Sequence, residues 1–225
     1  MPRLVSAFPQ LESFSVLIDC DWYYHNLLLP GRTDILASHS NLRKLEIACA
    51  PPYWHVAPLV VDLPSSLTSL SLSVCDPFEH DEHGWSPDVL DGIVKIAPQL
   101  VQFDFWAGET LDEDTDVRGI LDEVLPKLSS VRRLGFPVQV VTDLFAAIGK
   151  LPELVELELE WSLELMPADC DPVEIVTLID GMSKLRQLTI GGPCYRDGRS
   201  TAWSVEQKET IKMAAEHKLI EFVWK

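Results

Sequence analysis

The densest collection of side chains that could do chemistry lies in residues 75–83, which read CDPFEHDEH. His80 and His83, with carboxylates beside them, could ligate a divalent metal ion, because imidazole nitrogens and carboxylate oxygens are common zinc ligands. Their spacing matches no closed zinc site, and the segment has the composition of a loop. We therefore predict no metal centre here. A metal-binding protein or a hydrolase that uses His80 and His83 is the alternative.

Two other patterns resemble chemical sites in composition alone. Residues 112–116, DEDTD, are acidic like a calcium loop but lack its turn glycine and its closing glutamate. The five cysteines include no CxxC pair, and no Cys, His and Asp can be placed together as a nucleophilic set. Neither a G-x-S-x-G motif nor a glycine-rich phosphate loop occurs in the sequence. We therefore predict no catalytic residue, no metal and no cofactor, and expect that the chain is not an enzyme.

An apolar phrase, Leu-x-x-Leu-x-Leu, recurs along the whole chain and must position whatever site exists. Its eight copies begin at Leu11, Leu42, Leu67, Leu100, Val131, Leu154, Leu185 and Leu219. Apolar and polar residues alternate at the end of each copy, which predicts a short, half-buried strand. Repeats about 30 residues apart predict a solenoid. Solenoids usually present a long binding surface and not a catalytic pocket.

Apolar residues with helical spacing precede most of these phrases. The predicted helices cover residues 86–97, 117–128, 140–151, 172–185 and 204–217. Ser86-Pro87, Asp171-Pro172 and Ser204 stand where helices commonly begin. A strand–helix–strand unit that repeats in one direction predicts parallel strands, because the helix is the crossover connection.

The phrase resembles the strand of leucine-rich repeat proteins. The long units with helices resemble the ribonuclease-inhibitor-like class, and above all the repeat region of fungal F-box/leucine-rich-repeat proteins. This resemblance covers roughly residues 4–225. It implies an α/β horseshoe of about eight repeats, with parallel strands on the concave face and helices on the convex face. We expect one domain over residues 1–225, with no F-box segment.

The resemblance also carries a functional expectation. It implies a non-catalytic protein-interaction module, such as the substrate-recognition part of an F-box-type ubiquitin ligase receptor. The partners would then include Skp1 and cullin machinery, if an F-box is present in the full-length chain. Cys20, Cys49, Cys75 and Cys194 follow their phrases close to where such proteins place Asn or Cys. We interpret the cysteines as buried small residues beneath the turns.

Strand alternation predicts which side chains face a partner. Positions 1, 4 and 6 of each phrase should point into the core, while positions 3 and 5 and the following residue should point outward. This places three carboxylates on one strand face and an aromatic residue beside a fourth carboxylate two repeats away. The predicted partner-binding residues are Asp104, Trp106, Glu156, Glu158 and Glu160. Aromatic and charged side chains of this kind dominate many interfaces and would suit a basic segment.

Composition and charge narrow the class of partner. The formal net charge is −17, which disfavours nucleic acid and anionic membrane surfaces. Residues 100–180 contain 18 Asp and Glu against 5 Lys and Arg, whereas residues 181–225 contain 5 against 8. The acidic excess is either a solvated face or a footprint for a basic partner. No signal peptide, no apolar membrane span and an odd cysteine count indicate a cytoplasmic or nuclear protein with reduced thiols.

Other interpretations remain open. Ser69, Ser71 and Ser73 should form a small polar step on the same face. The loops after the strands carry aromatic residues that would mark a second partner surface: Trp22, Tyr23, Tyr24, Tyr53, Trp54, Trp85, Trp161 and Tyr195. A truncated relic without retained binding function would expose an apolar amino-terminal edge at Leu4, Val5, Phe8 and Phe14.

Overall fold

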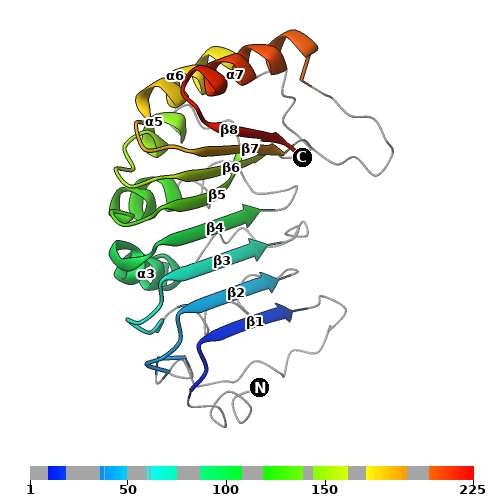
Figure 1. Cartoon of the computed structure of the whole chain (residues 1–225). Coiled ribbons are helices and arrows are strands. Elements are labelled where there is room, and N and C mark those ends of the chain that lie inside the picture. The colour runs from blue at the N-terminus through cyan, green and yellow to red at the C-terminus, as the bar shows by residue number, and fades with distance from the viewer. Residues whose placement is uncertain are drawn as a thin grey trace.

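Eight parallel strands form one open sheet in the computed structural model of this chain (Figure 1). The strands are β1 (Ser13–Ile18), β2 (Lys44–Cys49), β3 (Ser69–Val74), β4 (Gln102–Ala107), β5 (Arg133–Val138), β6 (Glu156–Trp161), β7 (Gln187–Gly191) and β8 (Glu221–Trp224). They pair strictly in sequence order, from β1 to β8. The predicted strands and their parallel arrangement are therefore confirmed. The structure describes residues 10–18, 36–37, 39–49, 60, 62–74, 87–107, 119–138, 144–161, 171–191 and 203–225.

The register places equivalent positions of successive phrases side by side. Leu45 lies beside Leu70, which lies beside Phe103, and the row continues through Leu134 into the later strands. These side chains are fully buried. Position 4 of each phrase therefore forms a continuous apolar row under the sheet, and position 6 forms a second. Burial of such rows is the main favourable term in folding.

In the described residues, helical elements follow strands β3 to β7 and cover one face of the sheet (Figure 1). They include α3 (Pro87–Ile96), continued by η2 (Ala97–Gln99), then α5 (Leu144–Ile148), α6 (Pro172–Gly181) and α7 (Val205–His217). Among the described residues, no helix is long and apolar enough to cross a membrane. Their buried side chains, such as Ile93, Ile148 and Ile179, pack into the same core as the strands.

Two of the predicted helix starts have the expected caps. The side chain of Asp171 accepts a hydrogen bond of 2.9 Å from the N–H of Val173, directly before α6. Ser204 and Gln207 form a reciprocal capping box at the start of α7. Each cap satisfies backbone donors that the helix itself leaves without an acceptor.

The helix predicted over residues 117–128 has a different geometry in the part that the structure describes. A wide π-type turn, η3 (Ile120–Val124), runs into a 3₁₀ turn, η4 (Leu125–Lys127). The N–H of Leu125 donates to the carbonyl of Ile120, five residues back. Pro126 follows at once and has no N–H, so a regular α-helical ladder cannot continue here. The apolar side chains nevertheless point inward as the spacing predicts.

The eighth phrase differs from the pattern at its first residue. Position 1 was expected to point into the core in every phrase, but Leu219 is 87% exposed and Ile220 is buried instead. Leu219 has a φ of +59°, and the N–H of Ile220 donates to the carbonyl of Ala215. This is the geometry of a helix end with a left-handed residue after the cap. The turn that ends α7 therefore decides the orientation of Leu219, and the prediction for this position is wrong.

Leu219→Gly is expected to raise the free energy of unfolding by roughly 0.5–1 kcal/mol, although it removes a leucine. A left-handed backbone is strained for a residue with a Cβ and relaxed for glycine, while the exposed side chain contributes little packing. Urea denaturation of both proteins measures the difference. Leu185→Ala is the contrasting variant, because Leu185 is fully buried at the same position of the preceding phrase. That change should cost about 2–5 kcal/mol, and a loss of similar size for Leu219→Gly would contradict the prediction.

The far end of the sheet is covered by an aromatic cluster. The rings of Trp203 and Trp224 lie 6.0 Å apart, and Phe222 packs edge-on against Trp224 at 4.9 Å. The ammonium group of Lys208, from α7, lies 5.3 Å from the centre of the Trp224 ring. These contacts tie α7 to β8.

Candidate protein-binding surface

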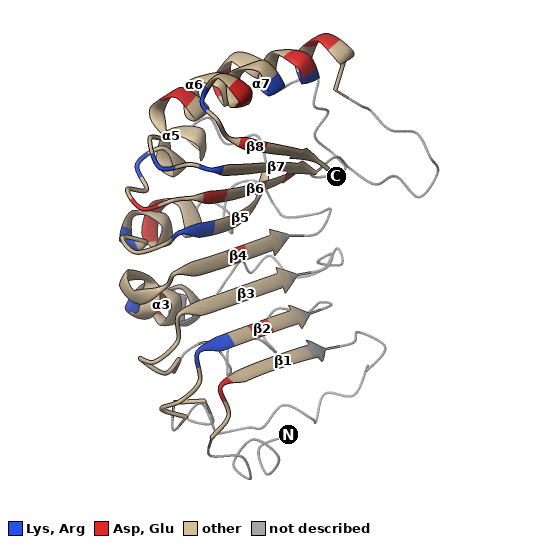
Figure 2. Ribbon diagram, viewed as in Figure 1, with Lys and Arg blue, Asp and Glu red and all other residues tan. Residues whose placement is uncertain are grey.

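The face of the sheet opposite the apolar rows carries the alternate residues of each strand, and we call it the polar face. Its third-position row runs Ser13, Lys44, Ser69, Gln102, Arg133, Glu156, Gln187 and Glu221. Its fifth-position row runs Ser15, Glu46, Ser71, Asp104, Gly135, Glu158, Thr189 and Val223. In Figure 2 strands β5 and β6 carry charges of opposite sign, while β3 carries none.

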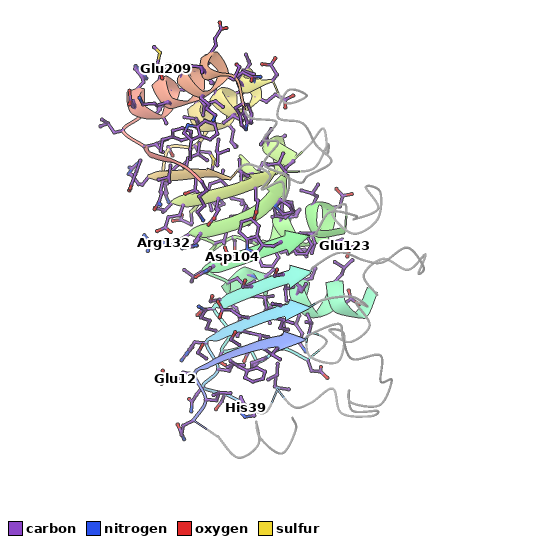
Figure 3. All side chains as sticks on the ribbon, turned by 90° about the vertical axis from the view of Figure 1, so that its right-hand side faces the viewer. Glu12, His39, Asp104, Glu123, Arg132 and Glu209 are labelled. Carbon is purple, nitrogen blue, oxygen red and sulfur yellow. The ribbon has the colours of Figure 1, made fainter. Side chains whose placement is uncertain are left out.

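Asp104 lies on this face but is almost completely buried, with 5% of its surface exposed. Figure 3 shows it on the sheet, apart from Glu123 on the helical layer. Its Oδ2 accepts a hydrogen bond of 2.5 Å from Gln102, whereas its Oδ1 has no hydrogen-bond donor. Burial raises the pKa of the Asp104 carboxyl, and the Gln102 hydrogen bond and the nearby Arg133 only partly oppose this. Asp104 is therefore a buried residue of the polar face that contacts Gln102 and Arg133, and it is not an exposed contact residue.

Arg133 lies at the centre of the predicted carboxylates. Its guanidinium is 3.8 Å from Oδ1 of Asp104, 3.7 Å from Oε2 of Glu156 and 3.4 Å from Oε2 of Glu158. Lys225 bonds to the other oxygen of Glu158. Glu158 thus has a cation on each carboxylate oxygen, and two of the three predicted glutamates are already paired within the chain.

Glu160 differs from these carboxylates because it forms no ion pair or hydrogen bond with any described residue. It is exposed, and it lies beside Gly191 on β7, whose ideal Cβ position is 3.5 Å from its Cγ. Partial burial raises the pKa of the Glu160 carboxyl, and the charge of Glu158 raises it further, against the opposing charge of Lys225. A carboxylate in this state gains from an additional cation.

Trp106, near the end of β4, is partly exposed on the same face. Its indole extends over β5, because a Cβ on Gly135 would lie 2.7 Å from Cζ2 of the ring and 2.6 Å from Oδ1 of Asp104. Only a glycine leaves room for both groups at this point. Unlike Trp224, Trp106 has no aromatic ring or cation packed on it among the described residues. One part of an amphipathic ring therefore stays available for contact.

The pairing between β4 and β5 ends before Trp106. The ladder between β4 and β5 ends at the pair Asp104 and Gly135, whereas β5 and β6 stay paired to the end of both strands. The N–H of Arg133 donates toward β4, so Pro137, four residues on, should direct its N–H to the same side. Proline has no N–H, and the strands diverge where this bond is missing (Figure 1).

The serine step lies on the other side of β4. Ser69, Ser71 and Ser73 are partly exposed and alternate along β3 as the sequence predicts. Ser71 lies beside Asp104, and Ser73 lies beside Trp106. Because serine side chains are short, the larger side chain of Trp106 projects beyond that of Ser73 on this side.

Sequence reasoning found the carboxylates but missed the cations among them. Asp104, Glu158 and Arg133 come together because adjacent parallel strands are in register. Arg133 occupies position 3 of its phrase, as Glu156 does, and aligning the phrases would have paired the two. Lys225 follows the last phrase, so no alignment of phrases would have revealed it.

Several predicted features lie outside the described residues. They include His80 and His83, the acidic segment 112–116, most of the cysteines, the aromatic loop residues other than Trp161, and Leu4, Val5 and Phe8. Trp161 was predicted in a loop, and that prediction is wrong, because Trp161 is the last residue of β6 and pairs with Val138. Phe14 is described and packs, partly buried, against the core. Within the described ranges, no group of three or more His, Cys, Asp or Glu side chains could hold a metal ion.

No protein-family model matches this chain, and no curated protein is significantly similar to it.

Proposed function

We propose that this chain is a leucine-rich-repeat horseshoe that binds a partner protein, without catalysis, on the polar face between β4 and β8. The repeated phrase, the sequential parallel strands and the helices on one side support this architecture. If the resemblance to F-box/leucine-rich-repeat proteins extends to function, the partner is a substrate of a ubiquitin ligase.

The observation that carries the proposal is the pair of groups without internal partners. Glu160 has no cation and Trp106 has no packed ring or cation among the described residues, although the other predicted residues are engaged by Arg133, Gln102 and Lys225. A partly exposed aromatic ring on β4 and a carboxylate without an ion-pair partner on β6 suit a segment that carries Lys or Arg and crosses these strands. Asp104, Glu156 and Glu158 then hold Arg133 in place beneath that segment.

Binding of a short peptide that alternates glycine with lysine and arginine tests this proposal. Glu160→Gln is expected to weaken binding roughly fivefold, the effect of removing one exposed ion pair of about 1 kcal/mol. Fluorescence anisotropy of the labelled peptide gives both affinities, and binding should weaken at high salt.

A matched control is available on the same face. Glu46 on β2 is also a partly exposed glutamate of the polar face, but Lys44 pairs with it at 3.1 Å. Glu46→Gln should change the affinity less than twofold, since it lies away from Trp106. Equal losses for the two variants would mean that the peptide follows only the overall negative charge, and the proposed location would be wrong.

A further inference from the structure

Lys225, like Lys44, is a cation of the polar face that a single carboxylate holds in the part of the chain that the structure describes, and Lys225 is the one that lies on the β6 carboxylates. It follows β8, its N–H donates to the carbonyl of Ile190 at 3.0 Å, and its ammonium bonds to Oε1 of Glu158. The Lys225 side chain is 60% exposed, whereas that of Glu158 is 19% exposed. A largely exposed ammonium therefore lies on a carboxylate that is mostly covered.

Arg133 and Lys225 differ in how firmly they are held. Arg133 lies within 4 Å of three carboxylates on two neighbouring strands, and its guanidinium is a rigid fork. Lys225 has one ion-pair partner at the end of a flexible stem. Another cation that approached this part of the face would displace Lys225 much more easily than Arg133.

Glu158 and Glu160 can act together on one cation. They are alternate residues of β6, so their side chains leave the same face of the sheet about 7 Å apart. The charge of Glu158 raises the pKa of the Glu160 carboxyl, and the charge of Lys225 lowers it. The ammonium of Lys225 therefore acts electrostatically on both carboxylates, although it bonds to only one.

A second observation is that a buried carboxylate oxygen on this part of the face receives no hydrogen bond. Asp104, on the same row as Glu158, keeps Oδ1 without a hydrogen-bond donor, although the residue is more than nine-tenths buried. That oxygen lies 2.6 Å from the ideal Cβ position of Gly135 on β5, and its ion-pair partner, the Nε of Arg133, is 3.8 Å away, beyond hydrogen-bond distance. Buried carboxylate oxygens are normally satisfied, so an additional donor at this row would be favourable.

We propose that Glu158 and Glu160 form a subsite for one ammonium or guanidinium group of the partner protein, and that Lys225 occupies this subsite until the partner displaces it. The inference rests on the proposed function and adds to it the position of one partner side chain and an internal competitor. Lys225 lowers the affinity for the partner because its contact with Glu158 must first be broken.

Lys225→Met tests whether Lys225 competes with the partner for Glu158 and Glu160, and Lys44→Met is the control. Both changes remove one positive charge from the same face, and Lys44 also has a glutamate partner, Glu46. With the glycine-alternating basic peptide as the probe, Lys225→Met should bind about three- to fivefold tighter than the unchanged chain, and Lys44→Met less than twofold tighter. In a Glu158→Gln background, Lys225→Met should no longer improve binding more than Lys44→Met does.

The outcomes separate this inference from the proposed function. Equal gains for Lys225→Met and Lys44→Met would overturn the competitor, while the loss of affinity in Glu160→Gln would still support the binding face. If the unchanged chain does not bind the basic peptide at all, the proposed function fails and the subsite fails with it. Far-UV circular dichroism of each variant confirms that the compared proteins are folded.

Discussion

Phe105→Ala is expected to lower the free energy of unfolding by about 3–5 kcal/mol. Phe105 is fully buried, and its ring lies 5.7 Å from that of Phe136 on the next strand. Backbone pairing between these two strands has already ended at Gly135. The two rings therefore hold β4 and β5 together where hydrogen bonds do not, and urea denaturation measures what they contribute.

The same variant should also change how the chain unfolds. In a stacked array, each unit is coupled mainly to its neighbours, so weakening one junction separates the two halves. We expect a broader transition with a smaller dependence on urea for Phe105→Ala. Phe103→Ala is the matched control, because Phe103 is equally buried on the same strand but lies where the β4–β5 ladder is intact. It should lose similar stability in a single transition. An equally sharp transition for both variants would contradict the proposed weak junction.

Arg133→Ala is expected to lower the free energy of unfolding by about 2 kcal/mol at about pH 7, between the values for exposed and buried ion pairs. The guanidinium is half exposed, which reduces the effect, but it faces three carboxylates, one of which is buried. Its removal leaves Asp104 charged in a covered position and leaves like charges facing one another. Urea denaturation of both proteins at the same salt concentration measures the loss.

The loss should shrink as the pH falls. Burial raises the pKa of Asp104 above its ordinary value, so the native state binds this proton more tightly than the unfolded state does. A raised pKa means that Asp104 costs stability near neutral pH, and that the cost disappears as the pH falls through the native pKa to the unfolded value near 4. Removing Arg133 raises the pKa of Asp104 further, because the positive charge of Arg133 lowers it. Once Asp104 is protonated it carries no charge, so the absence of Arg133 costs less stability. A constant difference from about pH 7 to about pH 4 would contradict this explanation.

Two variants control for the loss of an arginine as such. Arg132 is the neighbouring residue, exposed at the amino end of β5 (Figure 3), and no ion pair joins it to another described residue. Arg132→Ala should change stability by less than about 0.5 kcal/mol. Asp104→Asn combined with Arg133→Ala should recover part of the loss, because a neutral amide replaces the uncompensated charge. Losses of equal size for Arg132→Ala and Arg133→Ala would exclude a specific role for the carboxylate cluster.

Periodicity alone was sufficient to predict the strands, their parallel order and most of the helices. A strand needs only that alternate residues can be buried, and each copy of the phrase meets this condition within six residues. Asp171 and Ser204 begin helices because a cap is a contact over two or three residues. These features depend on neighbours in the sequence, so they could be predicted without the fold. The five candidate contact residues were likewise found from alternation and residue type.

The state of those five residues was decided by contacts between segments far apart in the chain. Asp104 is buried because Gly135, 31 residues later, lets it lie beside the Trp106 indole over β5. Glu158 is paired with Arg133 and with Lys225, 67 residues later, while Glu160 on the same strand has no ion-pair partner among the described residues. Leu219 turns outward because the end of α7 requires a left-handed residue there. The sequence by itself therefore determined which residues share a face, through local periodicity. Only the tertiary structure decided which of them are compensated, because charge pairing depends on where each side chain turns on that face and on Lys225, which lies outside the repeated phrases.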